Sequence, residues 1–140
     1  QDRSSAASDV YKRQDMKLFA DLIRRANPKN LIFSAVDALL MSSYQLGAPG
    51  AIAAILTAAP GPSVKLWNAV QNENWDVALD LHQKLMPLWD AIGLDNMPSL
   101  CKYAQKLQGL NAGYARKPTS PATKTQKEKV EIALKGLGLI

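Results

Sequence analysis

Cysteine and histidine are nearly absent from this sequence, which contains one of each among its 140 residues. The single thiol, Cys101, cannot form an internal disulfide or a cysteine-rich zinc site, and this scarcity favours a reducing compartment. The single imidazole, His82, has no cysteine or carboxylate at ligand spacing, so we interpret it as an ordinary helical residue. We therefore expect a cytoplasmic protein without a metal site.

Long hydrophobic runs are also lacking. No apolar segment approaches the length that crosses a bilayer, and the N-terminal residues lack the apolar core of a signal peptide. Hydrophobic residues make up 47% of the sequence and charged residues 21%, which is typical of a globular domain rather than a disordered chain. We expect no transmembrane segment and no membrane partner.

Acidic residues are fewer than basic ones, and the formal net charge is +5. A basic protein can bind nucleic acid or another anionic partner. No aromatic RNA-binding motif or zinc-finger spacing accompanies the basic residues, so we interpret them as solvated surface and expect no nucleic-acid partner. An anionic ligand for some of them is the alternative. They gather toward the two ends of the chain: Arg3, Lys12, Arg13, Lys17, Arg116, Lys117, Lys124, Lys127, Lys129 and Lys135.

Residues 1–14, QDRSSAASDVYKRQ, differ from the rest of the chain. They are polar, show no hydrophobic periodicity and resemble a translated sequencing-adapter remnant. We interpret them as a non-native or disordered extension and exclude them from the prediction of the fold. A natural disordered arm is the alternative interpretation.

Periodic structure begins at Asp15. Apolar residues at helical spacing predict a first helix, which Pro28 ends. Two short apolar runs, 31–35 and 50–56, predict strands, and the segments 36–48 and 62–74 that come after them predict helices. We expect Asp37 as an N-cap or first-turn acid, Gly47 as a C-cap and Pro62 in a first turn. The residues on the buried face of the first helix are Leu18, Phe19, Leu22, Ile23 and Ala26.

The order strand, helix, strand, helix is typical of parallel strands that are covered by helices. The rest of the chain predicts only helices, within 77–92, 96–109 and 122–138, with Thr123 or Thr125 as the last N-cap. We interpret 15–74 as part of an α/β barrel and 75–140 as a helical extension. The three tryptophans, at 67, 75 and 89, are expected to pack between helices or subunits. Two parallel strands cannot form a stable sheet alone, so the chain reads as the end of a larger α/β protein.

Three consecutive segments carry a resemblance to a known family. They are LIFSAVDALLMSSYQLGAPGAIAAILTAAP (31–60), VKLWNAVQNENWDVALDLHQKLMPLWDAI (64–92) and NMPSLCKYAQKLQGLNAGYARKP (96–118). In their order and spacing they resemble the C-terminal part of the dihydrodipicolinate synthase and N-acetylneuraminate lyase family of Schiff-base aldolases. The resemblance implies the last two β/α units of a (β/α)₈ TIM barrel, followed by extra helices.

The resemblance also implies a chemistry. In this family a lysine forms a Schiff base with a 2-oxo acid, usually pyruvate, a tyrosine shuttles protons, and an aldehyde or sugar acid is the second substrate. No metal or diffusible cofactor is needed, and the parent is expected to be a homotetramer. Asp15 matches the end of the family's lysine motif, which places the lysine at Val10 and leaves Lys12 out of register. We therefore assign no catalytic residue here and expect the chain alone to be inactive.

Four residues are candidates for contact with substrate, because barrel active sites lie at the carboxyl ends of strands. The resemblance maps the pocket glycine of the family onto Ala35 and the isoleucine that packs near the keto acid onto Ile52. Ser34 and Asp37 flank Ala35, although Asp37 could equally serve as a helix cap. The methyl group of Ala35 implies a reshaped pocket and argues against aspartate semialdehyde as the substrate. Thr57 also departs from the usual asparagine.

A second interpretation belongs to another class of protein. The chain could be a small non-enzymatic helical interaction protein that folds alone and binds an acidic partner with its basic C-terminal tail. A phosphate-binding barrel of another family is a lesser alternative.

Overall fold

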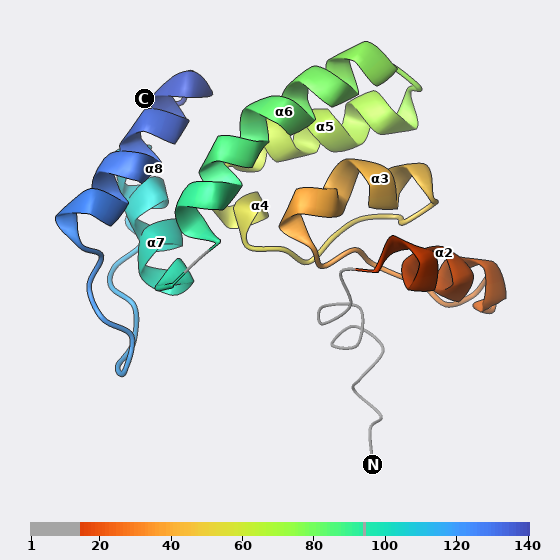
Figure 1. The fold of residues 1–140 in the computed structure, drawn as a ribbon, viewed down its shortest axis with the longest axis horizontal. Helices are drawn as coiled ribbons and strands as arrows, with labels where there is room; N and C mark the ends of the chain where they lie inside the picture. The colour runs from red at the N-terminus through yellow and green to blue at the C-terminus, as the bar shows by residue number, and fades with distance from the viewer. Residues whose placement is uncertain (1–14, 94) are drawn as a thin grey trace.

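The computed structural model describes residues 15–93 and 95–140 (Figure 1). The prediction of a non-native or disordered extension at 1–14 lies outside these residues. The described residues form helices joined by irregular segments. In chain order these are α2 (Met16–Arg25), the 3₁₀ helix η1 (Asp37–Leu39), α3 (Leu40–Gln45), α4 (Ile55–Ala58), α5 (Pro60–Gln71), α6 (Trp75–Ile92), α7 (Met97–Leu107) and α8 (Lys124–Gly136).

The predicted strands at 31–35 and 50–56 are wrong as extended strands. The two segments meet in one parallel bridge between Ser34 and Ala51, and the end of the second segment enters α4 at Ile55. A parallel ladder gains stability only when further strands pair on either side, and no such strand occurs among the described residues. The predicted parallel adjacency of the two segments is nevertheless confirmed by the bridge.

The helix predicted at 36–48 is shorter and has two parts, η1 and α3. Asp37 is a first-turn acid of η1, whereas the N-cap position belongs to Val36. Gly47 comes after the end of α3 with a φ of 99°, in the left-handed region that favours glycine, as predicted for a helix terminus. The next long helix, α5, begins at Pro60 rather than at Pro62.

Helices α5 and α6 lie side by side as a hairpin, and α6 also packs against α8 (Figure 1). The helix predicted within 77–92 is confirmed as α6, and its buried residues include Leu85, Leu88 and Ile92. Trp67 and Trp89 are partly buried against this core, whereas Trp75 at the start of α6 is 44% exposed. Helix α6 therefore packs both against its hairpin partner α5 and against the last helix, α8.

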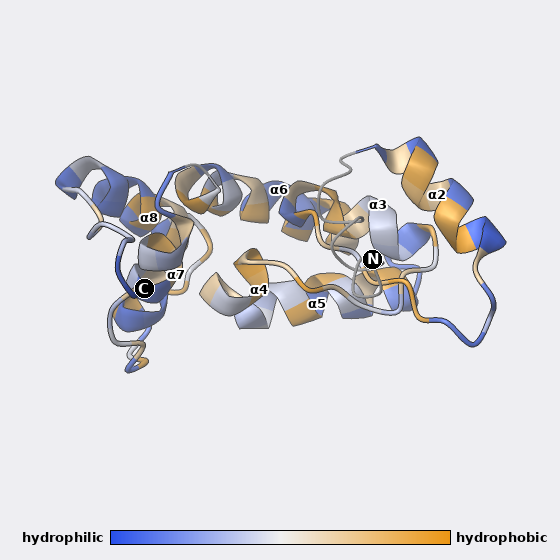
Figure 2. Cartoon of the chain, turned by 90° about the horizontal axis from the view of Figure 1, so that it is seen from below, coloured by the Kyte–Doolittle hydropathy of each residue, from blue (hydrophilic) through white to orange (hydrophobic). Residues whose placement is uncertain are grey.

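The predicted apolar face of α2 is buried at one residue, Phe19. Leu18 and Leu22 remain exposed, and Figure 2 shows apolar colour along the outer side of this helix.

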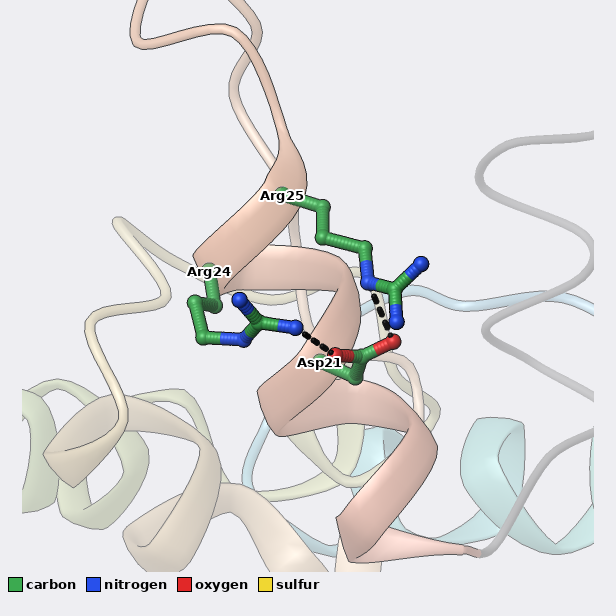
Figure 3. A network of polar contacts seen from close by, with 3 residues as sticks. All are labelled: Asp21, Arg24 and Arg25. Carbon is green, nitrogen blue, oxygen red and sulfur yellow. Dashed lines mark hydrogen bonds and ion pairs between the residues drawn. The ribbon is translucent and has the colours of Figure 1, made fainter.

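The opposite charges on α2 pair with one another. The guanidinium groups of Arg24 and Arg25 lie 2.6 and 2.7 Å from the Asp21 carboxylate and lower its pKa (Figure 3). Since these groups are solvent-exposed, we assign the pairs little stability.

The last helix, α8, begins with a capping box. The Gln126 amide N–H donates to Thr123 Oγ1 at 3.3 Å, and the Thr123 amide N–H donates to Gln126 Oε1 at 2.9 Å. The prediction that Thr123 or Thr125 caps this helix is thus settled in favour of Thr123. Val130 and Leu134 on the same helix are fully buried, so the cap orders a helix that completes the C-terminal core.

Replacing Thr123 by alanine removes the side-chain acceptor of this cap. We expect Thr123→Ala to lower the free energy of unfolding by about 1 kcal/mol, measured by urea denaturation. Thr125→Ala is the matched control, because Thr125 is exposed inside the helix and should change stability little. Equal losses in the two variants would contradict the assigned cap.

Candidate functional site

The candidate site forms where the two paired segments end and their helices begin. The Ser34 amide N–H donates to the Gly50 carbonyl at 3.0 Å, and the Ser34 carbonyl accepts from the Ile52 amide at 2.8 Å. Ser34 therefore ties its segment to both sides of Ala51. The arrangement brings Asp37, which comes after the first segment, next to α4, which begins at the end of the second.

Ser34 and Ala35 are both buried in this structure. The Ser34 hydroxyl donates to the hydroxyl of Ser43 on α3 at 2.9 Å, so it is directed into the protein interior. Ala35 joins the hydrophobic core, with 8% of its surface exposed. Their predicted contact with substrate stays a prediction.

Asp37 connects the two segments through its side chain. Its carboxylate accepts the Ile55 amide N–H at 2.5 Å, which satisfies a donor at the start of α4. Burial raises the pKa of Asp37, while backbone N–H groups of Ile55, Asp37 and Ala54 oppose this shift. The carboxylate thus holds α4 against η1, a role that differs from capping its own helix.

Ile52 lies on the outside of the site. Its backbone amide pairs with Ser34, but its side chain is 66% exposed. The family resemblance predicts that this side chain packs near a keto acid. In this structure it presents an uncovered apolar surface beside Ala51, and its contact with substrate stays a prediction.

Helix α7 contributes residues that the sequence analysis did not select. The side-chain amides of Gln105 and Gln108 donate to the carbonyls of Thr57 and Ala58 at 3.1 and 2.7 Å. Cys101 Sγ lies 3.9 Å from the Ala54 carbonyl oxygen. Burial raises the pKa of the Cys101 thiol, which disfavours the reactive thiolate. The glutamines were missed because a partly exposed glutamine on a helix has no distinctive pattern in sequence.

An apolar cavity of about 290 Å³ is lined by the start of the second paired segment and by residues of α3, α4 and α5. Gly50 and Ala51 form one wall, and Tyr44, Val64 and Trp67 are among the residues that line the remainder. None of the four predicted substrate contacts lines this cavity. The cavity nevertheless borders the site, because Ala51 pairs with Ser34 and Leu56 comes directly after Ile55 of α4.

Metal-ligating side chains do not cluster in the part of the chain that the structure describes. Within 15–93 and 95–140, no three His, Cys, Asp or Glu side chains are placed to hold a metal ion together. No helix in the same ranges is both long and apolar enough to cross a membrane. Burial lowers the pKa of His82, which lies on α6.

The paired parallel segments, each succeeded by a helix, are the arrangement of consecutive β/α units in a parallel α/β protein. A model of the dihydrodipicolinate synthetase family matches residues 12–137. The chain belongs to this family, and the resemblance seen in its sequence is confirmed. The match begins three residues before Asp15, inside the segment that we interpret as an extension.

Individual relatives agree with the family match. A 4-hydroxy-tetrahydrodipicolinate synthase from Archaeoglobus fulgidus is 30% identical over 126 residues, which are 90% of this chain and 44% of the relative. A synthase from Thermodesulfovibrio yellowstonii is 32% identical over 126 residues, 90% of this chain and 43% of the relative. The chain therefore spans less than half the length of these curated relatives.

Solved structures show the same likeness in the fold. A crystal structure of a dihydrodipicolinate synthase has a TM-score of 0.80 and 29% identity, covering 91% of this chain and 44% of that one. An N-acetylneuraminate lyase from Fusobacterium nucleatum, crystallised with pyruvate, has a TM-score of 0.76 and 28% identity, covering 88% and 42%. The described helices are thus arranged as in part of these enzymes.

The buried carboxylate of Asp37 gives a pH-dependent prediction. Because burial raises its pKa above the ordinary 3.8, protonated Asp37 favours the folded state, and this contribution is lost as the pH rises through the folded-state pKa. Relative to Asp37→Asn, the free energy of unfolding of the wild type should fall between about pH 3 and pH 7. Urea denaturation of both proteins at the two pH values measures this difference.

Asp37→Ala is the companion variant, because it removes the acceptor of the Ile55 amide entirely. It should lower the free energy of unfolding at neutral pH by about 1–3 kcal/mol, since a buried N–H loses its partner. A wild type whose stability rises relative to Asp37→Asn as the pH increases would contradict the assigned environment.

Proposed function

We propose that this chain is the C-terminal part of a class I aldolase or lyase that forms or cleaves a carbon–carbon bond through a lysine Schiff base. The family match over 12–137 carries the proposal. The likeness to a lyase crystallised with pyruvate supports pyruvate, or another 2-oxo acid, as the first substrate. An aldehyde or a sugar acid is the second. The parent is proposed to be a cytoplasmic homotetramer.

The proposed reaction begins when a lysine amine attacks the keto carbon of pyruvate and water leaves, giving an imine. Loss of a proton from the methyl group gives an enamine, which adds to the aldehyde carbon, and hydrolysis then releases the product and the lysine. Cleavage takes the same steps in reverse. In this proposal the lysine and the proton-shuttling tyrosine belong to a part of the parent that precedes this chain.

The chain itself supplies one wall of the substrate pocket and the packing behind it. Ala35 and Ile52 are proposed to contact the 2-oxo acid, with Ser34 and Asp37 fixing the backbone on either side of Ala35. The contacts of these two side chains suit this division, because the Ser34 hydroxyl and the Asp37 carboxylate both bind groups of the protein itself. Residues 15–74 are proposed as the barrel part and 75–140 as the helical extension.

Trapping with borohydride tests the Schiff base. The 140-residue chain, incubated with pyruvate and sodium borohydride, should show no lysine adduct by mass spectrometry. In a chimera, residues 12–137 replace the matching part of the Archaeoglobus fulgidus synthase. This chimera should form one adduct, on the lysine that the synthase part contributes. The intact synthase is the positive control.

Two outcomes would count against the proposal. A pyruvate adduct on Lys12 of the isolated chain would show that this lysine is competent and the register wrong. A folded chimera that binds no pyruvate would show that this chain cannot complete the pocket.

The methyl group of Ala35 gives a second prediction for the chimera. Ala35→Gly restores the glycine typical of the family and removes a methyl group from the proposed pocket wall. We expect the kcat/KM for condensation of pyruvate with aspartate semialdehyde to rise by about tenfold or more, measured by a coupled assay. Ala38→Gly is the matched control, because it makes the same change nearby on η1.

If Ala35→Gly and Ala38→Gly change kcat/KM equally, the methyl group of Ala35 does not shape the pocket. The assignment of Ala35 as a substrate contact would then be withdrawn.

A further inference from the structure

Helix α4 is too short to be stable by itself. It contains four residues, Ile55–Ala58, and a helix of one turn gains too few hydrogen bonds to offset the entropy of its nucleation. Its position must therefore come from contacts with the rest of the protein. Burial of Ile55 and Ala58 supplies the apolar part of these contacts.

Two prolines after α4 reduce the number of backbone N–H donors near its last carbonyl groups. The last carbonyl oxygens of a helix have no partner within it, and they accept from backbone N–H groups of the next residues, from side chains or from water. The residues three and four positions after Thr57 are Pro60 and Gly61, and those after Ala58 are Gly61 and Pro62. Since proline has no amide hydrogen, Gly61 is the one backbone donor within this reach of either carbonyl, and each has one donor fewer than another sequence would supply.

Two glutamines of α7 donate hydrogen bonds to these carbonyl groups. Gln105 Nε2 donates to the Thr57 carbonyl at 3.1 Å. Gln108 Nε2 donates at 2.7 Å to the Ala58 carbonyl and at 2.9 Å to the carbonyl of Ala104 in its own helix. One hydrogen of the Gln108 side-chain amide thus binds α4, and the other binds a carbonyl of its own helix, α7.

The opposite end of α4 is held by the candidate site. The Ile55 amide N–H donates to the Asp37 carboxylate at 2.5 Å. A displacement of α4 away from α7 would therefore move the donor on which the buried Asp37 depends. It would also move the backbone that comes after Ile52.

We propose that Gln105 and Gln108 are positioning residues, which fix α4 from the helical extension and thereby set the wall of the substrate pocket around Asp37 and Ile52. The effect on the pocket rests on the proposed function. The positioning of α4 by the two glutamines does not rest on the proposed function, and it can be tested in the 140-residue chain alone. The glutamines touch no reacting atom, so their effect on catalysis passes through α4.

Amide hydrogen exchange in the full 140-residue chain tests the hold on α4. The observable is the exchange rate of the Ile55 amide divided by that of Leu85, a buried residue of α6. Replacing both glutamines by methionine keeps the side-chain length and removes the donors. We expect this ratio to rise about tenfold in the double variant and by less in each single variant.

Replacement by lysine separates hydrogen bonding from packing. Gln105→Lys and Gln108→Lys retain an N–H donor, so their exchange ratios should stay close to that of the wild type. Gln83→Glu, on the exposed side of α6, is the control for a surface change. If methionine leaves the ratio unchanged, or if lysine raises it as much as methionine does, the proposal is overturned. General destabilisation accelerates both amides together, leaves the ratio unchanged and is also negative.

The chimera tests the consequence for the pocket. With both glutamines replaced by methionine, the KM for pyruvate should rise about fivefold while kcat changes less, because the lysine and tyrosine are untouched. A change in the exchange ratio without a change in KM overturns the link to the pocket. A wild-type chimera without pyruvate binding is instead a failure of the proposed function, and the exchange experiment remains decisive for α4.

Discussion

The hydrogen bond between the Ile55 amide and the Asp37 carboxylate is the constraint on which the arrangement of the candidate site depends. The two paired segments share one parallel bridge, which is too little backbone pairing to fix the helices at their ends. The carboxylate adds a second connection, beyond the bridge, between η1 and α4. Because Asp37 is buried, its partner is needed to offset the loss of water around the charge. The same contact therefore stabilises the junction and makes it sensitive to any movement of α4.

Stability is distributed unevenly around this junction. On one side, α6 packs against α5 and α8 and carries Leu85, Leu88 and Ile92 into a continuous core. On the other side, α2 buries Phe19 alone, and Ile52 exposes most of its surface. The candidate site lies where the well-packed helices meet the exposed apolar segments. Most of the buried hydrophobic residues accordingly lie in α5 to α8 rather than in the paired segments.

The family relationship and the departures from it carry different information. The match over 12–137 establishes the family, and the arrangement of helices agrees with solved members. Under the proposed function, the departure at Ala35 concerns pocket shape, since its methyl group would occupy space that glycine leaves to the ligand. The end of α4 concerns support instead, because Pro60 and Pro62 offer no amide hydrogen there and side chains of α7 donate to its last carbonyls.

The sequence by itself determined the helices with strong local signals and the family. The α8 cap results from threonine and glutamine three residues apart, and the turn after α3 results from a glycine that tolerates positive φ. The strands predicted from the sequence at 31–35 and 50–56 are wrong, because an apolar run becomes an extended strand only when neighbouring strands pair with it. Only the tertiary structure decided that Asp37 binds α4 rather than its own helix, and that Gln105 and Gln108 reach across to it. Those contacts join residues 18 to 50 positions apart, and side-chain identity alone does not specify partners over such separations.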